Sequence, residues 1–163
     1  MKVLGIDPGY ARLGYGITER QGAKSVCVDY GVIETVKEMP HAERLVTVRN
    51  AVRDLIGKYS PDVVGVEELL FQKNVKTALQ VAEARGVILL TARDLAVPIF
   101  EIGPKQVKQG LTSDGNADKQ QVQYMVKTIL QLPEIPQPDD AADALAIALV
   151  TEQLWQNPLV RNT

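Results

Sequence analysis

The chain has 163 residues, a hydrophobic fraction of 45% and a formal net charge of −2 at pH 7, which suit one globular domain with its own core. No apolar run approaches the roughly 20 residues of a membrane span, and the opening MKVLGID is charged too early for a signal peptide. The lone Cys27 and lone His41 exclude a zinc site made only of His and Cys, and a single cysteine is typical of a reducing cytoplasm.

Three strands are predicted in the first 35 residues. The first is an apolar run that ends on Asp7, just before a Pro-Gly turn, and a charge at the end of a buried strand needs a partner. In the second, Gly14 and Gly16 indicate the close approach of another backbone. Short turns between the runs favour an antiparallel meander of strands over residues 2–7, 12–20 and 25–35.

Helices and strands then alternate. Apolar side chains at helical spacing predict a helix over residues 41–59, and a short apolar run over 61–69 includes Glu67 and Glu68 near its end. This order favours a parallel strand that the chain reaches through a helical crossover. A helix rich in small residues and another short strand follow, over residues 77–96 and 97–103.

Further helices are predicted in the last third of the chain. A proline at the favoured first position begins the helix over residues 104–111, and Asp118 is the expected N-cap of the next helix. A Pro-rich break then precedes an Ala-rich final helix over 139–155. Together these elements predict an α/β domain over residues 1–156, built on a mixed sheet with helices on both faces, and a short tail over 157–163.

Carboxylates stand at the ends of three of these elements. Functional groups gather at the carboxyl ends of parallel strands in such sheets, so the acids of the first two positions are expected to be neighbours. On the last helix, Asp140 and Asp143 are three residues apart and are expected to share a face, whereas Asp139 should point elsewhere. The acids are Asp7, Glu67, Glu68, Asp139, Asp140 and Asp143.

Four clustered acids repel one another unless a cation lies between them. Hard divalent cations prefer oxygen ligands, and two such ions about 4 Å apart activate a water and stabilise the leaving oxygen in phosphodiester hydrolysis. Each position alone also has a structural explanation, as a turn former, a solvated strand end or a helix-terminal charge. Asp143 lies one turn inside an Ala-rich helix and needs a partner there, so one metal site explains all three positions best.

The charge pattern suits a polyanionic substrate. Residues 72–127 hold 8 basic and 5 acidic side chains, whereas residues 128–163 hold 1 basic and 5 acidic ones. The overall charge of −2 argues weakly against nucleic acid as a partner. If four carboxylates belong to a metal site, however, the rest of the chain is net +2, as expected for a metal-dependent enzyme that acts on polyanions.

Five segments together resemble the RuvC family of bacterial Holliday-junction resolvases, which belongs to the RNase H-like superfamily. They are GIDPGYARLGYGI, VGVEELLFQKNVKTALQVAEARGV, GPKQVKQGLT, ADKQQVQYMV and PQPDDAADALAIAL, in the order of the family and over nearly the whole chain. The resemblance implies an RNase H-like mixed five-stranded sheet, with three antiparallel strands followed by parallel ones, flanked by helices. It also implies a homodimer that resolves four-way DNA junctions by paired symmetric nicks in recombination and repair.

The resemblance implies a site for two Mg²⁺ ions, which Mn²⁺ can replace, with Asp7 bridging the two ions. Glu68 and Asp139 are acids outside the family motif and are not expected to be direct ligands. The implied ligands are Asp7, Glu67, Asp140 and Asp143.

The family also uses basic residues to contact DNA, and two lysines match those positions. Lys108 is an expected phosphate contact, and Lys119 is expected to contact phosphate or to stabilise the transition state. The family often has Phe three residues after the catalytic Glu; here Leu70 stands there and Phe71 follows, so Phe71 either stacks on a base or belongs to the core. Further expected phosphate contacts are Lys73, Lys76, Arg85 and Lys105.

The resemblance further implies the RuvA–RuvB branch-migration complex as a partner, and the small-residue helix over 77–96 suits either a dimer interface or core packing. Three other functions stay open. An actin-like or sugar-kinase ATPase shares the Gly-rich hairpin but normally needs two such domains. An RNase H-like nuclease on RNA or another DNA structure, and a non-catalytic junction-binding module, are the others, although the presence of all four acids argues against the last.

Overall fold

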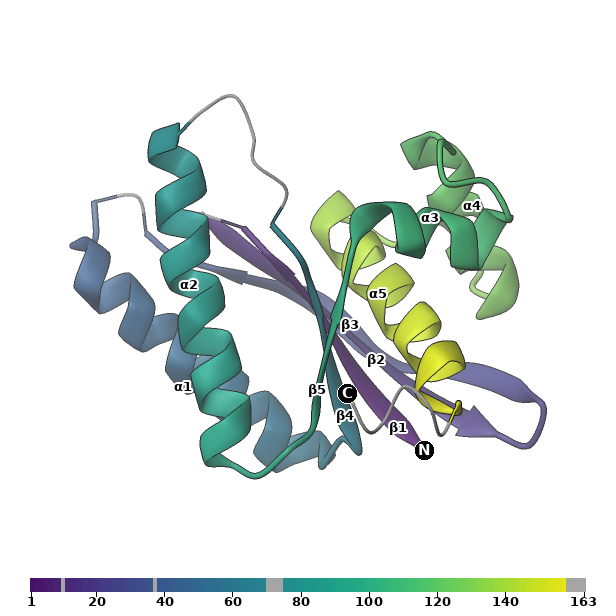
Figure 1. Cartoon of the computed structure of the whole chain (residues 1–163), viewed down its shortest axis with the longest axis horizontal. Helices are drawn as coiled ribbons and strands as arrows, with labels where there is room; N and C mark the ends of the chain where they lie inside the picture. Colours follow the sequence, from purple (N-terminus) through teal and green to yellow (C-terminus); the bar gives the residue numbers. More distant parts are fainter. Residues whose placement is uncertain (10, 37, 70–74, 158–163) are drawn as a thin grey trace.

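A computed structural model of the chain describes residues 1–9, 11–36, 38–69 and 75–157, with the side chains of all of these except residues 75–77. The middle layer is a five-stranded sheet in the order β3-β2-β1-β4-β5 (Figure 1). β1, β2 and β3 pair antiparallel, whereas β4 runs parallel to β1 and β5 runs parallel to β4, which confirms the predicted meander and crossover. The strands are β1 (Lys2–Pro8), β2 (Arg12–Gln21), β3 (Lys24–Glu34), β4 (Val63–Glu67) and β5 (Ile99–Ile102).

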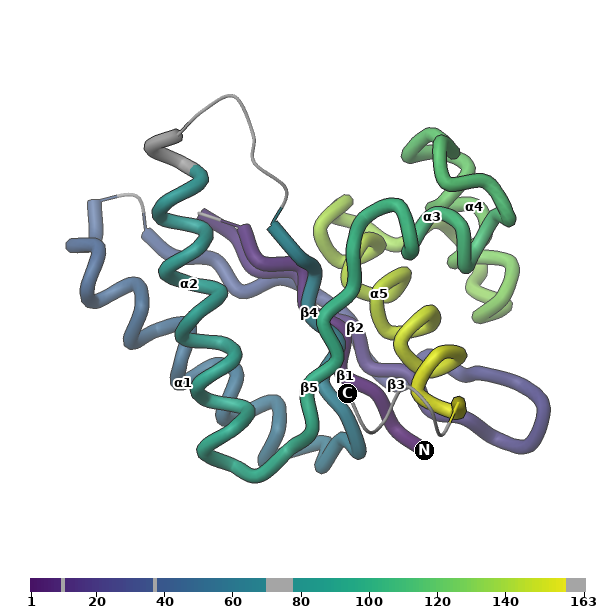
Figure 2. Tube along the Cα trace, in the orientation of Figure 1, coloured from purple at the N-terminus to yellow at the C-terminus, as the bar shows by residue number. Residues whose placement is uncertain are grey.

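Helices cover both faces of the sheet, as predicted. α1 and α2 pack on one face, while α5 lies across the other and carries α3 and α4 on its outer side (Figures 1 and 2). Asp118 caps α4 by accepting a hydrogen bond of 2.9 Å from the Gln121 N–H. Within the described residues, no helix is long and apolar enough to cross a membrane. The helices are α1 (His41–Tyr59), α2 (Val75–Asp94), α3 (Pro104–Thr112), α4 (Lys119–Ile129) and α5 (Asp139–Trp155).

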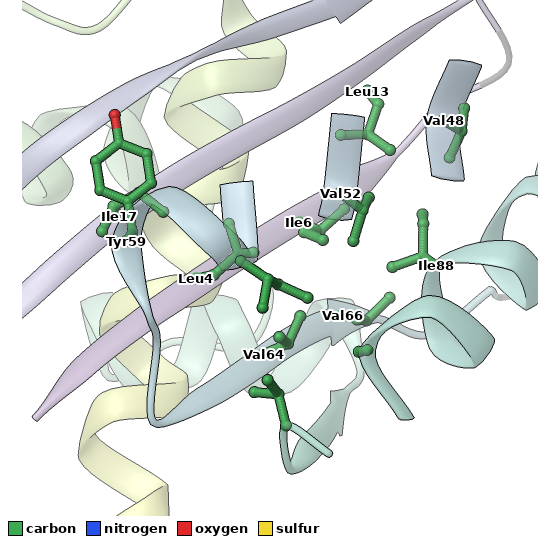
Figure 3. Packing of buried hydrophobic residues seen from close by; sticks show 13 residues of the cluster. Leu4, Ile6, Leu13, Ile17, Val48, Val52, Tyr59, Val64, Val66 and Ile88 are labelled. Carbon is green, nitrogen blue, oxygen red and sulfur yellow. The ribbon is translucent and has the colours of Figure 1, made fainter. Parts of the chain in front are cut away.

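The strand period of two decides which side chains of β1 and β4 face α5. Leu4 and Ile6 of β1 pack with Val64 and Val66 of β4 into the core beneath α1 and α2 (Figure 3). Successive side chains of a strand point to opposite faces, so the intervening residues of both strands face α5. The last of these on β1 is Asp7.

Three glycines in register let α5 lie directly on the sheet. Gly5 of β1 pairs with Gly16 of β2 and with Gly65 of β4. A Cβ on Gly5 would lie 2.2 Å from the Ala144 carbonyl oxygen, and one on Gly16 would lie 2.7 Å from the Leu145 backbone nitrogen. The prediction that a backbone approaches the second strand closely is confirmed, and the approaching backbone is that of α5.

Candidate active site

The register of β1 and β4 brings two predicted acids together. Ile6 is opposite Val66 in the parallel pair, so Asp7 and Glu67 are the next residues of neighbouring strands. Each lies two positions beyond a glycine that contacts α5, and therefore on the face that α5 covers. The two carboxylates are neighbours at the carboxyl ends of parallel strands, as predicted.

α5 contributes the third acid, Asp143. Gly14, the register partner of Asp7, lies so close to α5 that a Cβ there would be 2.0 Å from the Asp140 carbonyl oxygen. This contact holds the start of α5 against β2, beside the end of β1. Asp143, one turn into the helix, consequently faces the same space as Asp7 and Glu67.

These acids share one pocket of about 280 Å³ with two lysines. Lys108 comes from α3 and Lys119 from the start of α4, so five different elements contribute charged groups. The pocket thus joins acids expected to hold a metal with lysines expected to bind phosphate. Its lining is Asp7, Glu67, Pro104, Val107, Lys108, Lys119, Val122, Asp143 and Ala146.

Burial and mutual repulsion raise the pKa of each acid in the pocket. Burial, together with the charges of Glu67 and Asp143, raises the pKa of Asp7 from 3.8 to about 7. The pKa of Glu67 rises to about 7 by burial and by the charge of Asp143. Burial also raises the pKa of Asp143, against the opposing effect of Lys119. Asp7 and Glu67 are therefore partly protonated near neutral pH unless a cation shares the pocket.

We expect the metal-free protein to lose stability between about pH 4 and pH 7. A carboxyl whose folded pKa is raised stabilises the fold below its unfolded pKa, and this contribution is lost as the pH rises through the folded pKa. For Asp7, the difference between 3.8 and about 7 corresponds to roughly 4 kcal/mol. Asp7→Asn should therefore unfold at a higher temperature than the wild type at about pH 8 in EDTA, and at nearly the same temperature at about pH 4.

Thermal unfolding followed by circular dichroism across this pH range checks the expectation. Mg²⁺ at about pH 8 should raise the unfolding temperature of the wild type more than that of Asp7→Asn, because the ion needs the ionised carboxylate. If the two proteins keep the same difference in unfolding temperature at every pH, Asp7 does not carry the raised pKa.

Lys119 bridges two carboxylates of α5. Its Nζ lies 3.0 Å from Asp143 Oδ2 and 3.2 Å from Asp139 Oδ2. Asp139 also accepts a hydrogen bond of 3.1 Å from Gln123 Nε2. Desolvation lowers the pKa of Lys119, but its two carboxylate partners outweigh this effect and raise the pKa overall. The ammonium is consequently charged at neutral pH.

The prediction that Asp139 points away from Asp143 is wrong, because both carboxylates contact Lys119, whereas Asp140 as a metal ligand beside Asp143 stays a prediction. At 3.6 residues per turn, Asp139 is only about 40° from Asp143 around the helix, while Asp140 is about 60° away on the other side. Asp139 therefore joins Asp143 at Lys119. Asp140 turns towards the guanidinium of Arg12, with 3.5 Å between Nε and Oδ2, and does not line the pocket. Its charge nevertheless raises the pKa of Asp7.

Other expected site residues lie apart from the acids. Lys105 lines a separate groove between α3 and α5. Glu68 is exposed and does not line the acid pocket. Arg85 donates a hydrogen bond of 3.0 Å to the Glu67 carbonyl oxygen and pairs with Glu101, so it holds the end of β4. Outside the described residues or side chains lie Leu70, Phe71, Lys73, Lys76 and most of the expected tail.

Several residues of the site were not predicted from the sequence. Arg12, Gln123 and the contact of Asp139 with Lys119 depend on how α4 and β2 meet α5. Two features of the sequence bear on these contacts. Arg12 stands two residues before Gly14, on the strand that α5 approaches. Lys119 and Gln123 are four residues apart, so they share a face of α4, but the sequence does not show that this face meets α5.

The donor set of the pocket fits a hard divalent cation. Carboxylate oxygens are the ligands that Mg²⁺ prefers, and it usually takes one or two of them together with water and substrate phosphate. Among residues 1–9, 11–36, 38–69 and 75–157, no three His, Cys, Asp or Glu side chains already form a metal-ligand cluster. The carboxylates that the pocket offers to such an ion are those of Asp7, Glu67 and Asp143.

The chain is similar to RuvC proteins over most of its length. The family model described as crossover junction endodeoxyribonuclease RuvC matches residues 3–151. A protein of that description from Thermosipho melanesiensis is 51% identical over 148 residues, which are 91% of this chain and 94% of the relative.

Two solved structures from Thermus thermophilus have a similar fold. RuvC alone superposes with a TM-score of 0.88 at 38% identity and covers 96% of each chain. RuvC in complex with Holliday junction substrate superposes with a TM-score of 0.89 at 35% identity and covers 99% of each chain.

Proposed function

Because the chain belongs to the RuvC family of crossover junction endodeoxyribonucleases, we propose that the pocket of Asp7, Glu67 and Asp143 is the active site with which it cuts DNA. Membership confirms the resemblance seen in the sequence and makes the protein a hydrolase that resolves Holliday junctions in recombination and repair. It also excludes the actin-like ATPase. The observation that carries the proposal is the convergence of three acids and two lysines in one pocket.

Metal-dependent cleavage, which this family performs, needs ligands that the pocket supplies. We assign two Mg²⁺ ions, replaceable by Mn²⁺, to Asp7, Glu67 and Asp143 of the pocket and to Asp140, which lies beside it. When bound, the ions supply an activated water and stabilise the leaving oxygen of the phosphodiester. Asp7 is the best candidate to serve both ions, because the charges of the other three acids all act on it.

The lysines of the pocket serve the phosphate. Lys119 holds a charged ammonium at the pocket wall, where it stabilises negative charge that develops on the phosphate in the transition state. Lys108 lines the same wall and contacts a neighbouring phosphate. Lys105, in the groove between α3 and α5, extends this basic surface along a DNA arm. The expected DNA contacts of Phe71 and Lys76 complete the proposal.

Resolution of a junction needs two cuts, which a homodimer with two symmetric sites provides. α2 supports this part of the proposal. Its Ala84, Ile88 and Ala92 are buried against the core, while Leu79 and Leu90 on other sides of the helix are each 61% exposed. Exposed leucines of this kind suit burial against a second copy. The dimer would act in the bacterial cytoplasm with the RuvA–RuvB complex as its partner.

Nicking of a synthetic mobile four-way junction tests the proposed function. With Mg²⁺ we expect paired nicks at symmetric positions, and neither EDTA-treated samples nor linear duplex of the same sequence should be cut. Junction binding without cleavage in Mg²⁺ and Mn²⁺, over several junction sequences, would leave only a binding module. Faster cleavage of RNA–DNA hybrid than of the junction would indicate a different nuclease of the same fold.

A further inference from the structure

We propose that Asp139 is a positioning residue that holds the ammonium of Lys119 at the wall of the active site, with Gln123 anchoring its carboxylate. The proposal rests on the active site proposed above and adds to it a residue that is outside the expected metal ligands. Asp139 acts through Lys119 and touches neither the phosphate nor the ions.

The geometry gives each oxygen of Asp139 a separate partner. Oδ1 accepts the hydrogen bond of 3.1 Å from Gln123 Nε2, and Oδ2 lies 3.2 Å from Lys119 Nζ. Lys119 and Gln123 are four residues apart on α4 and therefore share a face of that helix. Gln123 is only 8% exposed, so its amide is fixed by packing and orients the carboxylate that in turn orients the lysine.

Asp139 is free to do this because α5 does not use it as a cap. The N-cap of α5 is Pro138, and among the described residues no side chain caps this helix end. Both carboxylate oxygens of Asp139 are therefore engaged by groups of α4, one by the Lys119 ammonium and the other by the Gln123 amide. A carboxylate with a separate partner for each oxygen suits the role of an anchor.

Asp139 is also the partner that Lys119 keeps when the site is loaded. The other partner, Asp143, lines the pocket and is a proposed metal ligand, and a carboxylate that neutralises a cation attracts an ammonium less strongly. Asp139 lies outside the pocket lining. Without Asp139, Lys119 would have no fixed carboxylate partner in the loaded site and would sample other rotamers.

Substitution of Asp139 tests the proposal, because it should lower the nicking rate without weakening junction binding. We expect Asp139→Asn to lower the single-turnover nicking rate about tenfold at saturating protein while the Kd for the junction in EDTA changes less than about twofold. Asp139→Glu keeps the charge and should restore most of the rate. Glu134→Gln removes one charge from an exposed acid just before α5 and is the matched control, with no expected loss of rate.

A double-mutant cycle shows whether Asp139 acts through Lys119. In a Lys119→Gln background, Asp139→Asn should change the remaining rate by less than about twofold, because the group it positions is already gone. A further tenfold loss in that background, or an unchanged rate for Asp139→Asn in the wild-type background, overturns the proposal. Absence of cleavage by the wild type would instead refute the proposed function.

A measurement that does not depend on catalysis distinguishes failure of the positioning role from failure of the proposed function. Lysines labelled by reductive ¹³C-methylation give separate NMR signals, and the Lys119 signal is identified by its loss in Lys119→Arg. In metal-free protein, Asp139→Asn should move this signal towards those of exposed lysines, while Glu134→Gln should leave it in place. An unmoved signal in Asp139→Asn overturns the positioning role, whatever the enzyme cleaves.

Discussion

Asp7→Asn should abolish junction cleavage, with a loss of at least about 10³-fold in the Mg²⁺-dependent rate. Asp7 is the last but one residue of β1, in the centre of the sheet, beside Glu67 of β4 and near the first turn of α5. The charges of Glu67, Asp140 and Asp143 all raise the pKa of Asp7. An amide in its place keeps the shape of the side chain but removes the ionised oxygen that the pocket offers a divalent cation.

Nicking rates of the two proteins on the same mobile junction, at several Mg²⁺ concentrations, measure this loss. Asp54→Asn makes the same chemical change on an exposed position of α1, across the sheet from the pocket, and should cut at the rate of the wild type. Asp7→Asn should still fold, since removal of a carboxyl group with a raised pKa stabilises the metal-free protein. Retention of more than a tenth of the wild-type rate would exclude Asp7 as the central ligand.

Gly14→Ala should lower the cleavage rate about 100-fold without touching any charged group. Gly14 is the register partner of Asp7, and a Cβ at this position would lie 2.0 Å from the carbonyl oxygen of Asp140. That contact is with backbone, which cannot rotate away as a flexible side chain does. The first turn of α5 must therefore shift and take Asp140 and Asp143 with it, away from Asp7.

We expect Gly14→Ala to lower the free energy of unfolding by about 1–3 kcal/mol, as overpacking usually does. Gly57→Ala is the matched control, because no described atom lies within 4 Å of a Cβ there and alanine suits the interior of α1 better than glycine. The cleavage rates, unfolding temperatures and junction affinities of both variants show whether the first turn of α5 must stay in place for cleavage. Wild-type cleavage by a folded Gly14→Ala would mean that the site does not depend on where α5 begins.

The sequence was sufficient for the elements and for the family because both depend on local patterns. Apolar spacing predicted α1 over the residues that the structure shows, and the cap at Asp118 was read from one side chain. Strand periodicity and the carboxyl ends of parallel strands predicted that Asp7 and Glu67 are neighbours. The glycines of the second strand indicated that a backbone lies on it.

Only the tertiary structure decided which acid of α5 meets which cation. Asp139, Asp140 and Asp143 lie within about 100° of one another on the helix, so the sequence alone does not rank them. The docking of α4 brings Lys119 and Gln123 to Asp139, and the contact of Gly14 with α5 leaves Asp140 beside Arg12. Such contacts join residues far apart in the chain and depend on how the helices pack on the sheet. The sequence alone does not predict them, because local propensity carries no information about a distant partner.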